Sequence, residues 1–357
     1  MGDFGTLLPL AIGFMAVNNM HPAGFLVVFG LTNIATGLIY GIPLPLQPMK
    51  VIAATAIAQA WAPSLISATA LSMGLFWLLM GALPGVERLV QKTPDGVIRG
   101  IQLALGLNLA WSGLRMATDN SWWLGLLTVS IIWTLNRNQR AMPTALVVIL
   151  LGVVTMVWQG TLPELELTWT ARPTLSLPVL SLAWEGFWRA GIGQIPLTLA
   201  NAVVACLALI KDFFPESDIS ERHLMFNMGA MNVVSSVFGG FPMCHGAGGL
   251  ASQYYFGART GGANIMEGTI ELVLGLFLAG TLLQFFRAFP VAIVGGMMVV
   301  VGVELGKLTH GVARRSWLVT VGTVLPSLFL NMGVGFVCGL AVHIVSENLH
   351  RFKPASH

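Results

Sequence analysis

The stretch Phe241-Pro-Met-Cys-His-Gly-Ala-Gly-Gly249 interrupts a very apolar chain with one proline and several glycines. Proline lacks an N–H and glycine weakens helix interiors, so we expect an unwound segment followed by a helix that begins near Gly246. A matching stretch, Gly41-Ile-Pro-Leu-Pro-Leu-Gln-Pro-Met-Lys50, precedes a short helical run, 51–60, in the first half. Paired interruptions of this kind indicate a transporter's binding site, because helix N-termini can face an anion there.

The composition is that of an integral membrane protein. Hydrophobic residues make up 55% of the chain, charged residues make up 9%, and the mean hydropathy is +0.78. Runs such as 124–134 and 291–303 lack the alternation of barrel strands, so helices are expected. One span needs about 20 residues, and the chain therefore has room for up to about fourteen spans with tight loops. Three cysteines in apolar surroundings give neither a disulfide framework nor metal-ligand spacing.

The predicted fold class is an all-α polytopic membrane protein with about 14 transmembrane segments in two inverted seven-helix repeats. The expected spans are 4–20, 23–40, 49–60, 64–83, 97–114, 121–135 and 141–158 in the first repeat (1–160), and 188–210, 224–240, 246–256, 262–284, 288–306, 315–331 and 333–349 in the second (186–350). A polar linker, 161–185, joins the repeats. The third span of each repeat is short, and an odd number of spans per repeat forces the two copies to be inverted.

The distribution of basic residues predicts the orientation. With the N-terminus inside, Arg115, Arg172, Arg189 and Arg287 fall outside, Lys50 stays unassigned, and the other basic residues are cytoplasmic. This bias follows the positive-inside rule. We therefore expect a multi-pass protein of the cell (inner) membrane whose N- and C-termini are both cytoplasmic.

Sequence motifs in both halves occur in the order of a known family. They are Gly2-Asp-Phe-Gly-Thr6, Asn33-Ile-Ala-Thr-Gly37, Pro45-Leu-Gln-Pro-Met-Lys50, Gly193-Gln-Ile-Pro-Leu-Thr198 with Asn201, Pro242-Met-Cys-His-Gly-Ala-Gly-Gly-Leu250, Gln253-Tyr254 and Phe256-Gly-Ala-Arg259. Together these motifs resemble the molybdate transporter family of the sulfate permease (SulP) superfamily. Many sulfate permeases also have a C-terminal STAS domain, which this chain lacks, so we expect no regulation through such a domain.

The resemblance implies a fold in which spans 1–4 and 8–11 form a core domain and spans 5–7 and 12–14 form a gate domain. It also implies that the substrate lies between the N-termini of half-helices 3 and 10. The expected function is secondary active import of a tetrahedral oxyanion, preferentially molybdate, by an elevator-like movement of the core against the gate.

The second interrupted segment supplies the first candidate substrate-binding residues, Cys244, His245, Gly246, Ala247 and Gly248. Their N–H groups can point at an oxyanion while the glycines let it approach the backbone. The alternative interpretation is a tight helix–helix contact through small residues. His245 either donates to or titrates with the anion, or is a neutral histidine satisfied by a backbone carbonyl. Cys244 is either a ligand or an apolar filler.

The first interrupted segment and span 8 add Gln47, Pro48, Met49, Gln194 and Thr198. The amide N–H of a glutamine can bind an oxyanion without placing a full charge in lipid. The alternative is a hydrogen bond that ties the loop together. Thr198 lies four residues after Gln194 and therefore on the same helical face; its alternative role is interhelical packing.

Charged residues within the spans are functional candidates by default. The acids are Asp3, Glu267, Glu271 and Glu304. Glu267 and Glu271 lie on one helical face, where a close pair of carboxylates can share a proton; Glu267 alternatively lies near the membrane edge beside Arg259. Lys50 either compensates the charge of a dianion, pairs with Asp3 or Glu271, or extends its ammonium to the membrane surface.

No enzyme activity, cofactor or metal is expected, since the chain has no P-loop and no paired nucleophile and base. The expected partners are molybdate, with tungstate and sulfate as further candidates, a coupling cation such as H⁺, the lipid bilayer, and a second copy in a homodimer, but no nucleic acid. A sulfate or nucleobase permease of the same fold and an anion channel remain alternatives. Nucleobase carriers typically place acids on spans 8 and 10, where this chain has Gln194 and the Cys244-His-Gly246 run.

Overall fold

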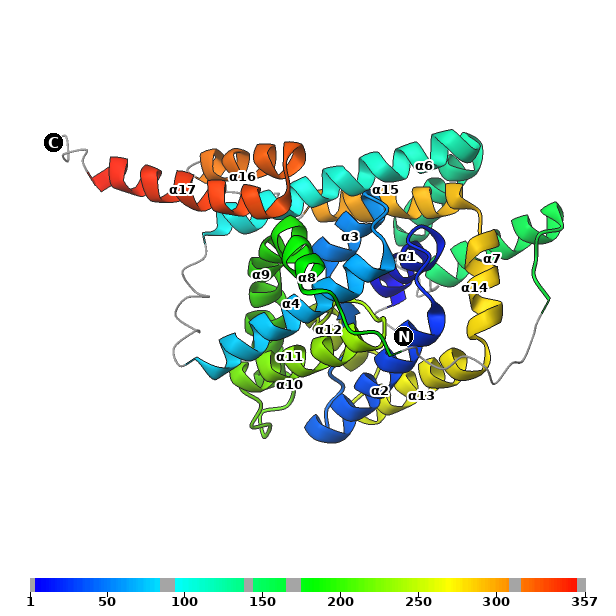
Figure 1. The fold of residues 1–357 in the computed structure, drawn as a ribbon, viewed down its shortest axis with the longest axis horizontal. Helices are drawn as coiled ribbons and strands as arrows, with labels where there is room; N and C mark the ends of the chain where they lie inside the picture. Colours follow the sequence, from blue (N-terminus) through cyan, green and yellow to red (C-terminus); the bar gives the residue numbers. More distant parts are fainter. Residues whose placement is uncertain (1–3, 84–93, 138–143, 165–174, 308–315, 352–357) are drawn as a thin grey trace.

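The computed structural model describes residues 4–83, 94–137, 144–164, 175–307 and 316–351, and these residues are mostly helical (Figure 1). Asp3 lies outside the described residues. The helices are α1 (Phe4–Ala16), α2 (Pro22–Tyr40), α3 (Lys50–Ala58), α4 (Pro63–Ala82), α6 (Asp95–Arg137), α7 (Thr144–Gln159), α8 (Leu180–Gly186), α9 (Ile192–Thr198), α10 (Cys206–Phe213), α11 (Glu221–Val237), α12 (Ala247–Tyr255), α13 (Gly262–Phe277), α14 (Ala279–Ala288), α15 (Val291–Lys307), α16 (Trp317–Phe329) and α17 (Met332–Arg351). Two π-helical segments, η1 (Phe187–Gly191) and η2 (Leu199–Ala205), flank α9, and two short strands, β1 (Leu46–Pro48) and β2 (Met243–His245), complete the described part of the chain.

The helix bounds follow the expected spans closely, with two differences. The uninterrupted helix expected over 262–284 is wrong: the chain leaves helical geometry at Leu278, and α13 and α14 meet at 87°. The helix expected from 188 begins already at Leu180. The two spans expected at 97–114 and 121–135 both lie within α6, which is broken between them at Ser121 (φ −163°, ψ 91°). The break at Leu278 has no proline beside it, and the apolar pattern did not reveal it.

Length and hydropathy identify three helical stretches able to cross a membrane within the described residues, Pro22–Tyr40, Pro63–Ala82 and Leu180–Phe213, or four if the bent pair α13–α14 counts as one. The last of these stretches runs continuously through α8, η1, α9, η2 and α10. Three further apolar helices are shorter. Short helices are expected in a chain whose spans are interrupted or paired with half-helices.

Glycines let α2 and α13 pack with their backbones in contact. A Cβ atom at Gly30 would lie 2.5 Å from the carbonyl oxygen of Gly268, and one at Gly37 would lie 2.5 Å from that of Gly261. In each helix the two glycines are seven residues apart, which is about two turns and places both on one face. Lipid supplies no hydrophobic force between helices, so close packing of this kind holds them together.

Similar contacts join α6 to α15 and α4 to α11. A Cβ at Gly113 would lie 2.5 Å from the carbonyl oxygen of Gly295, and one at Gly229 would lie 2.8 Å from the backbone nitrogen of Leu78. In the view of Figure 1, α6, α15, α16 and α17 gather along the upper side, and α2, α11 and α13 lie below them. The second helix of each half packs on the fourth helix of the other half, which is the arrangement that two inverted copies would produce.

The half-helix α3 lies in the interior, and α12 is partly buried. Each has nine residues and follows a three-residue strand. Every residue of α3 from Val51 to Ile57 is buried, as expected of a helix that is apolar on all sides. Phe241 packs with its ring centroid 4.5 Å from that of Phe25 and 5.3 Å from that of Phe14, which fixes the start of the second interrupted segment.

Replacing Gly30 with alanine should destabilise the fold. The added methyl would press on the α13 backbone, and such overpacking costs about 1–3 kcal/mol. Thermal unfolding of the purified protein in detergent measures the loss. Gly306→Ala is the matched control, because a Cβ there meets nothing within 4 Å. Equal stability of the two variants would contradict the proposed backbone contact.

Candidate functional site

The two interrupted segments pair as an antiparallel ribbon. Leu46 lies opposite His245, Gln47 opposite Cys244 and Pro48 opposite Met243. On the outer edge of β2, the side-chain amide of Asn232 accepts from the Met243 N–H at 2.7 Å and donates to the Met243 carbonyl at 2.7 Å. This amide therefore takes the place of a third strand, and it satisfies backbone groups that lipid could not.

The ribbon holds the two half-helix N-termini near one another. Because the strands are antiparallel, α3 leaves one end of the ribbon and α12 leaves the other. Three residues of strand at about 3.3 Å each separate the two helix ends by roughly 10 Å. Each helix N-terminus carries about half a positive charge and unsatisfied N–H groups. The two helix N-termini at the ends of the ribbon can therefore attract an anion from two sides.

The N-terminus of α3 is already occupied by a protein group. The Val51 N–H donates to Gln194 Oε1 at 2.7 Å, and Gln194 Nε2 donates to Thr198 Oγ1 at 2.7 Å. Both side chains are 1% exposed. Gln194 therefore caps α3, as the tie-forming alternative predicted. Met49 is the fully buried N-cap residue, and Lys50, the first helical residue, is half-buried and has no ion-pair partner among the described residues.

The N-terminus of α12 is different. Its N-cap residue, Gly246, provides no side-chain cap, and a Cβ there would lie 2.5 Å from the amide of Gln47. Gly248, one residue past the buried Ala247, is exposed, and a Cβ there would meet nothing within 4 Å. These glycines therefore do not form a helix–helix contact. At Gly246 the glycine lets the buried Gln47 side chain approach, and at Gly248 it leaves space beside the first turn of the helix.

His245 is fully buried, and both of its ring nitrogens have neutral partners. Nδ1 lies 3.3 Å from the Pro45 carbonyl oxygen, and Nε2 lies 3.1 Å from Asn227 Nδ2. A carbonyl oxygen only accepts, so Nδ1 carries the proton and Nε2 accepts from the Asn227 amide. Asn227 also donates to Thr36 Oγ1 at 3.3 Å. This matches the alternative of a neutral histidine satisfied by a backbone carbonyl. Its neighbour Cys244 is buried.

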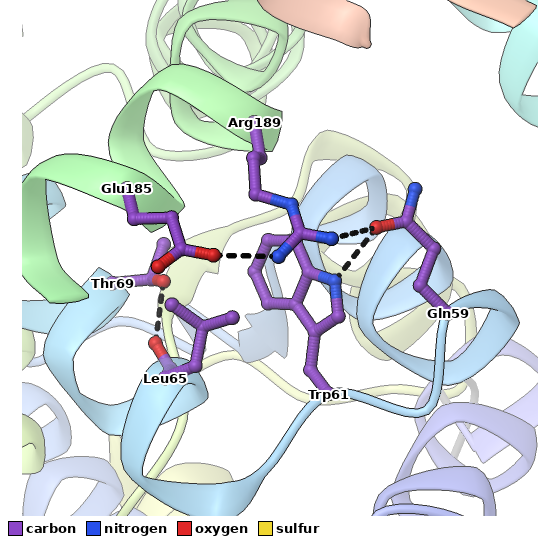
Figure 2. Close-up of polar contacts among 6 residues, drawn as sticks. All are labelled: Gln59, Trp61, Leu65, Thr69, Glu185 and Arg189. Atoms are coloured by element: carbon purple, nitrogen blue, oxygen red, sulfur yellow. Dashed lines mark hydrogen bonds and ion pairs between the residues drawn. The ribbon is translucent and has the colours of Figure 1, made fainter. Parts of the chain in front are cut away.

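An arginine closes the C-terminal end of α3 (Figure 2). Arg189 donates to Gln59 Oε1 at 2.9 Å and to Glu185 Oε1 at 2.7 Å, and its guanidinium lies 5.1 Å from the ring centre of Trp61. The Trp61 indole N–H also donates to Gln59 Oε1, at 2.9 Å. Gln59 is the C-cap residue of α3. A cation at the C-terminus of a helix interacts favourably with the helix dipole, and here it also fixes the C-terminal end of α3.

A second arginine, Arg259, binds the C-terminal end of α12 in the same way. Arg259 donates to the carbonyl oxygens of Tyr254 at 2.6 Å and Ala258 at 2.9 Å, and its guanidinium lies 3.6 Å from the centre of the Tyr254 ring. Phe213 stacks on Tyr254 with ring centroids 4.0 Å apart. Both half-helices are therefore anchored at the end remote from the ribbon by an arginine over an aromatic ring.

The in-span carboxylates form a separate cluster on α13. Glu271 Oε2 accepts from Asn33 Nδ2 at 2.9 Å, and Glu267 Oε2 accepts from Gln253 Nε2 at 3.2 Å. The ion pair considered for Lys50 and Glu271 is not formed in the described residues, where Glu271 is bound by an amide. Glu304 is exposed and pairs with Lys307 at 2.7 Å.

The structure thus places the ten predicted substrate-site residues around one ribbon and puts the described candidate acids on α13 and α15. The amides Asn33, Asn227, Asn232 and Asn264 were given no role by sequence reasoning. Polar side chains inside apolar spans are costly unless they are bonded, and this was the signal that could have identified them.

Comparison with known proteins gives a consistent result. The family model described as "Molybdate transporter of MFS superfamily" matches residues 1–109 and 186–305, which include both interrupted segments and the α13 carboxylates. Molybdate transporter 1 of Arabidopsis thaliana is 31% identical over 100% of this chain and 89% of its own length. Molybdate transporter 1 of Chlamydomonas reinhardtii is 29% identical over 95% of this chain and 89% of its own length.

Solved structures show the same fold. The transmembrane domain of the cyanobacterial bicarbonate transporter BicA aligns with a TM-score of 0.68 and 18% identity, covering 97% of this chain and 95% of that domain. The murine Slc26a9 anion transporter aligns with a TM-score of 0.72 and 14% identity, covering 98% of this chain and 67% of the other. The chain therefore has the all-α membrane fold of these transporters.

Replacing Gln194 with leucine should lower stability, because the buried Val51 N–H would lose its acceptor. An orphaned buried donor costs about 1–3 kcal/mol. Gln159→Leu is the matched control, since it makes the same change at an exposed glutamine at the end of α7. Thermal unfolding should rank wild type and Gln159→Leu above Gln194→Leu, and a Gln194→Leu variant as stable as wild type would show that Gln194 does not cap α3.

Proposed function

We propose that this chain, which belongs to the molybdate transporter family, is a secondary active transporter that imports molybdate across the cell membrane. Its relatives are named transporters, so it is not an enzyme. The observation that carries the site assignment is the N-terminus of α12, whose N-cap residue Gly246 offers no side chain and where Gly248 borders open space, while Gln194 occupies the opposing N-terminus of α3. The anion would lie against the first turn of α12, with α3 facing it.

The charges at this position suit a dianion. Two helix N-termini supply about half a positive charge each, which leaves roughly one negative charge of molybdate uncompensated. Lys50 begins α3, at a helix end where a cation is disfavoured by up to about 1 kcal/mol, and its ammonium group can supply the remaining compensation.

The fold suggests how the site would move. We place the two half-helices, the ribbon and the helix pairs α2–α13 and α4–α11 in a core that moves as one body. The gate would consist of α6, α7, α15, α16 and α17. Glycine contacts within the core pairs and between α6 and α15 keep each body rigid, so displacement of one against the other would carry the anion across in an elevator-like step.

Uptake of a dianion needs a driving force. Moving two negative charges inward against about 100 mV costs about 4.6 kcal/mol. This free energy corresponds to a concentration ratio across the membrane of more than a thousandfold. We therefore propose co-transport of a cation such as H⁺.

Calorimetry of molybdate, sulfate and uracil binding to the purified protein tests the substrate directly. Preferential molybdate binding supports the proposal, whereas preferential binding of sulfate or uracil supports a permease for another substrate. Uptake into liposomes then separates carrier from channel: saturable, gradient-driven accumulation is expected, and unitary currents would contradict it.

Gly248→Val should weaken molybdate binding by at least about tenfold, or 1.4 kcal/mol. The branched side chain would stand between the α12 N–H groups and the anion, while the Cβ meets no protein atom within 4 Å. Calorimetry measures the affinity and thermal unfolding confirms the fold. Gly246→Val is the less selective change, because it also displaces Gln47. Wild-type affinity in Gly248→Val would place the anion elsewhere.

Lys50→Gln should weaken molybdate binding by about tenfold and binding of a monovalent oxyanion of similar size much less, because charge compensation matters more for a dianion. Titration of both anions against wild type and variant provides the measurement. Unchanged affinities would leave Lys50 as a residue whose ammonium simply reaches the membrane surface.

A further inference from the structure

Five polar side chains from three helices meet beside the ribbon. They are Asn33 on α2, Gln253 on α12, and Asn264, Glu267 and Glu271 on α13. The three α13 residues are three and four positions apart and so share one face of the helix. Asn264 Nδ2 donates to Asn33 Oδ1 at 3.1 Å and to the Leu44 carbonyl oxygen at 2.6 Å. The cluster is therefore bonded directly to the segment that enters β1.

Two amide oxygens of this cluster lack a donor. The amide N–H groups of Asn33 and Gln253 are directed at the two carboxylates, and those of Asn264 are used twice. The buried oxygens Gln253 Oε1 and Asn264 Oδ1 have no hydrogen-bond partner among the described residues, although their residues are 4% and 0% exposed. Buried polar atoms are normally paired, so these two oxygens point to a missing electron-pair acceptor.

Charges on the surrounding helices do not supply that acceptor. Among the described residues, α2 and α12 have no Asp, Glu, Lys, Arg or His, and α14 has only Arg287, in its last turn. Tyr40, Tyr254 and Tyr255 are their other ionisable groups, and Tyr40 donates to the His223 carbonyl oxygen. Arg259, on the loop before α13, is held by Tyr254 and Ala258. Carboxylate and amide oxygens are the ligands of hard cations.

We infer that Glu267 and Glu271, with the amide oxygens of Gln253 and Asn264, form the binding site of the small monovalent cation that drives uptake. The cation is a proton or a sodium ion; a proton would convert one carboxylate into a donor, and a sodium ion would take several oxygens as ligands. This inference rests on the proposed co-transport, and it places the binding site of the co-transported cation between α12 and α13. Glu267 is half-buried and Glu271 is buried, so the site opens on the Glu267 side.

The position of the site explains how the cation would be coupled to the anion. Gln253 lies in the last turn of α12, whose first turn faces the proposed anion. A carboxylate beside the negative end of a helix is unfavourable, and a bound cation removes that penalty. Through Asn264 and Leu44 the same cluster holds the entry to β1. Cation binding would therefore stabilise the arrangement of α12 and the ribbon that binds the anion.

His245 is less suited to this role. Its two ring nitrogens are bound by the Pro45 carbonyl and the Asn227 amide, so protonating it would require Asn227 to turn its oxygen toward the ring. No such rearrangement is needed at the α13 cluster.

The first experiment measures molybdate uptake into proteoliposomes at clamped membrane potential, with either an inward pH gradient or an inward sodium gradient. One gradient should stimulate wild-type uptake. Glu271→Gln and Glu267→Gln should reduce that stimulation by about tenfold, within the usual range of coupling between two sites. The control Glu304→Gln removes an exposed carboxylate elsewhere in a helix and should behave as wild type. Stimulation retained in both α13 variants, or absent in wild type that binds molybdate, overturns the inference.

The second experiment needs no molybdate. Thermal unfolding of the purified protein is compared in sodium and in choline at fixed pH, and across pH in choline, because a ligand of the native state raises its stability. Wild type should be stabilised by sodium or by lower pH, and Glu271→Gln and Gln253→Leu should lose that response while Glu304→Gln keeps it. If sodium and lower pH stabilise all the variants as much as wild type, the proposed cation site is wrong. If the site responds as expected but molybdate does not bind, the proposed substrate fails and the cation site stands.

Discussion

The structure depends on one constraint, which is that backbone N–H and C=O groups within a membrane must find partners inside the protein. The two interrupted segments release such groups where the helices stop. Strand pairing of β1 with β2 satisfies part of them, and neutral amides satisfy others: Asn232 binds both backbone groups of Met243, Gln194 caps α3, and Asn18 donates to the carbonyls of Ala56 and Trp61 at the other end of α3. The amides are thus part of what allows the interrupted segments to fold inside the protein.

Within that solution the two half-helices are not equivalent. A protein amide fills the α3 end, whereas the α12 end has no side-chain cap and ends in glycine. An anion gains most where fewer protein groups compete for the N–H donors, which is why we propose α12 as the stronger partner of the anion. The arginines at the remote ends, Arg189 and Arg259, stabilise the helix dipoles and fix the helices in place. Because the C-terminal ends of α3 and α12 are anchored, their N-terminal ends are held in a defined position.

Among the described residues, the two carboxylates bonded to amides of this network, Glu267 and Glu271, lie together on α13. The amides around the ribbon are neutral and inexpensive to bury once they are bonded, whereas a carboxylate in the same place would repel an oxyanion and would be costly to desolvate. Glu267 and Glu271 instead lie on α13, where Gln253 of the last turn of α12 binds Glu267 and Asn33 links Glu271 to Asn264, which binds Leu44 before β1. In our proposal, a cation bound by these carboxylates would lie near the anion without forming a fixed ion pair with it.

Much of the architecture was predictable from the sequence because hydropathy and helix-breaking residues report on local structure. The apolar runs predicted most of the helices, the prolines and glycines at 41–50 and 241–249 predicted two interrupted segments, and the motifs indicated the family. Nothing local, however, distinguishes Gln194, which caps a helix, from Gln47, which lies against Gly246, or marks the break at Leu278 in a run without proline. Their roles depend on which group lies opposite each of them, and the bonds joining Asn33 to Glu271 and Asn264 to Leu44 connect residues more than 200 positions apart. Only the tertiary structure could decide those partners, because a side chain's hydrogen-bonding capacity is fixed by its chemistry but its partner is fixed by packing.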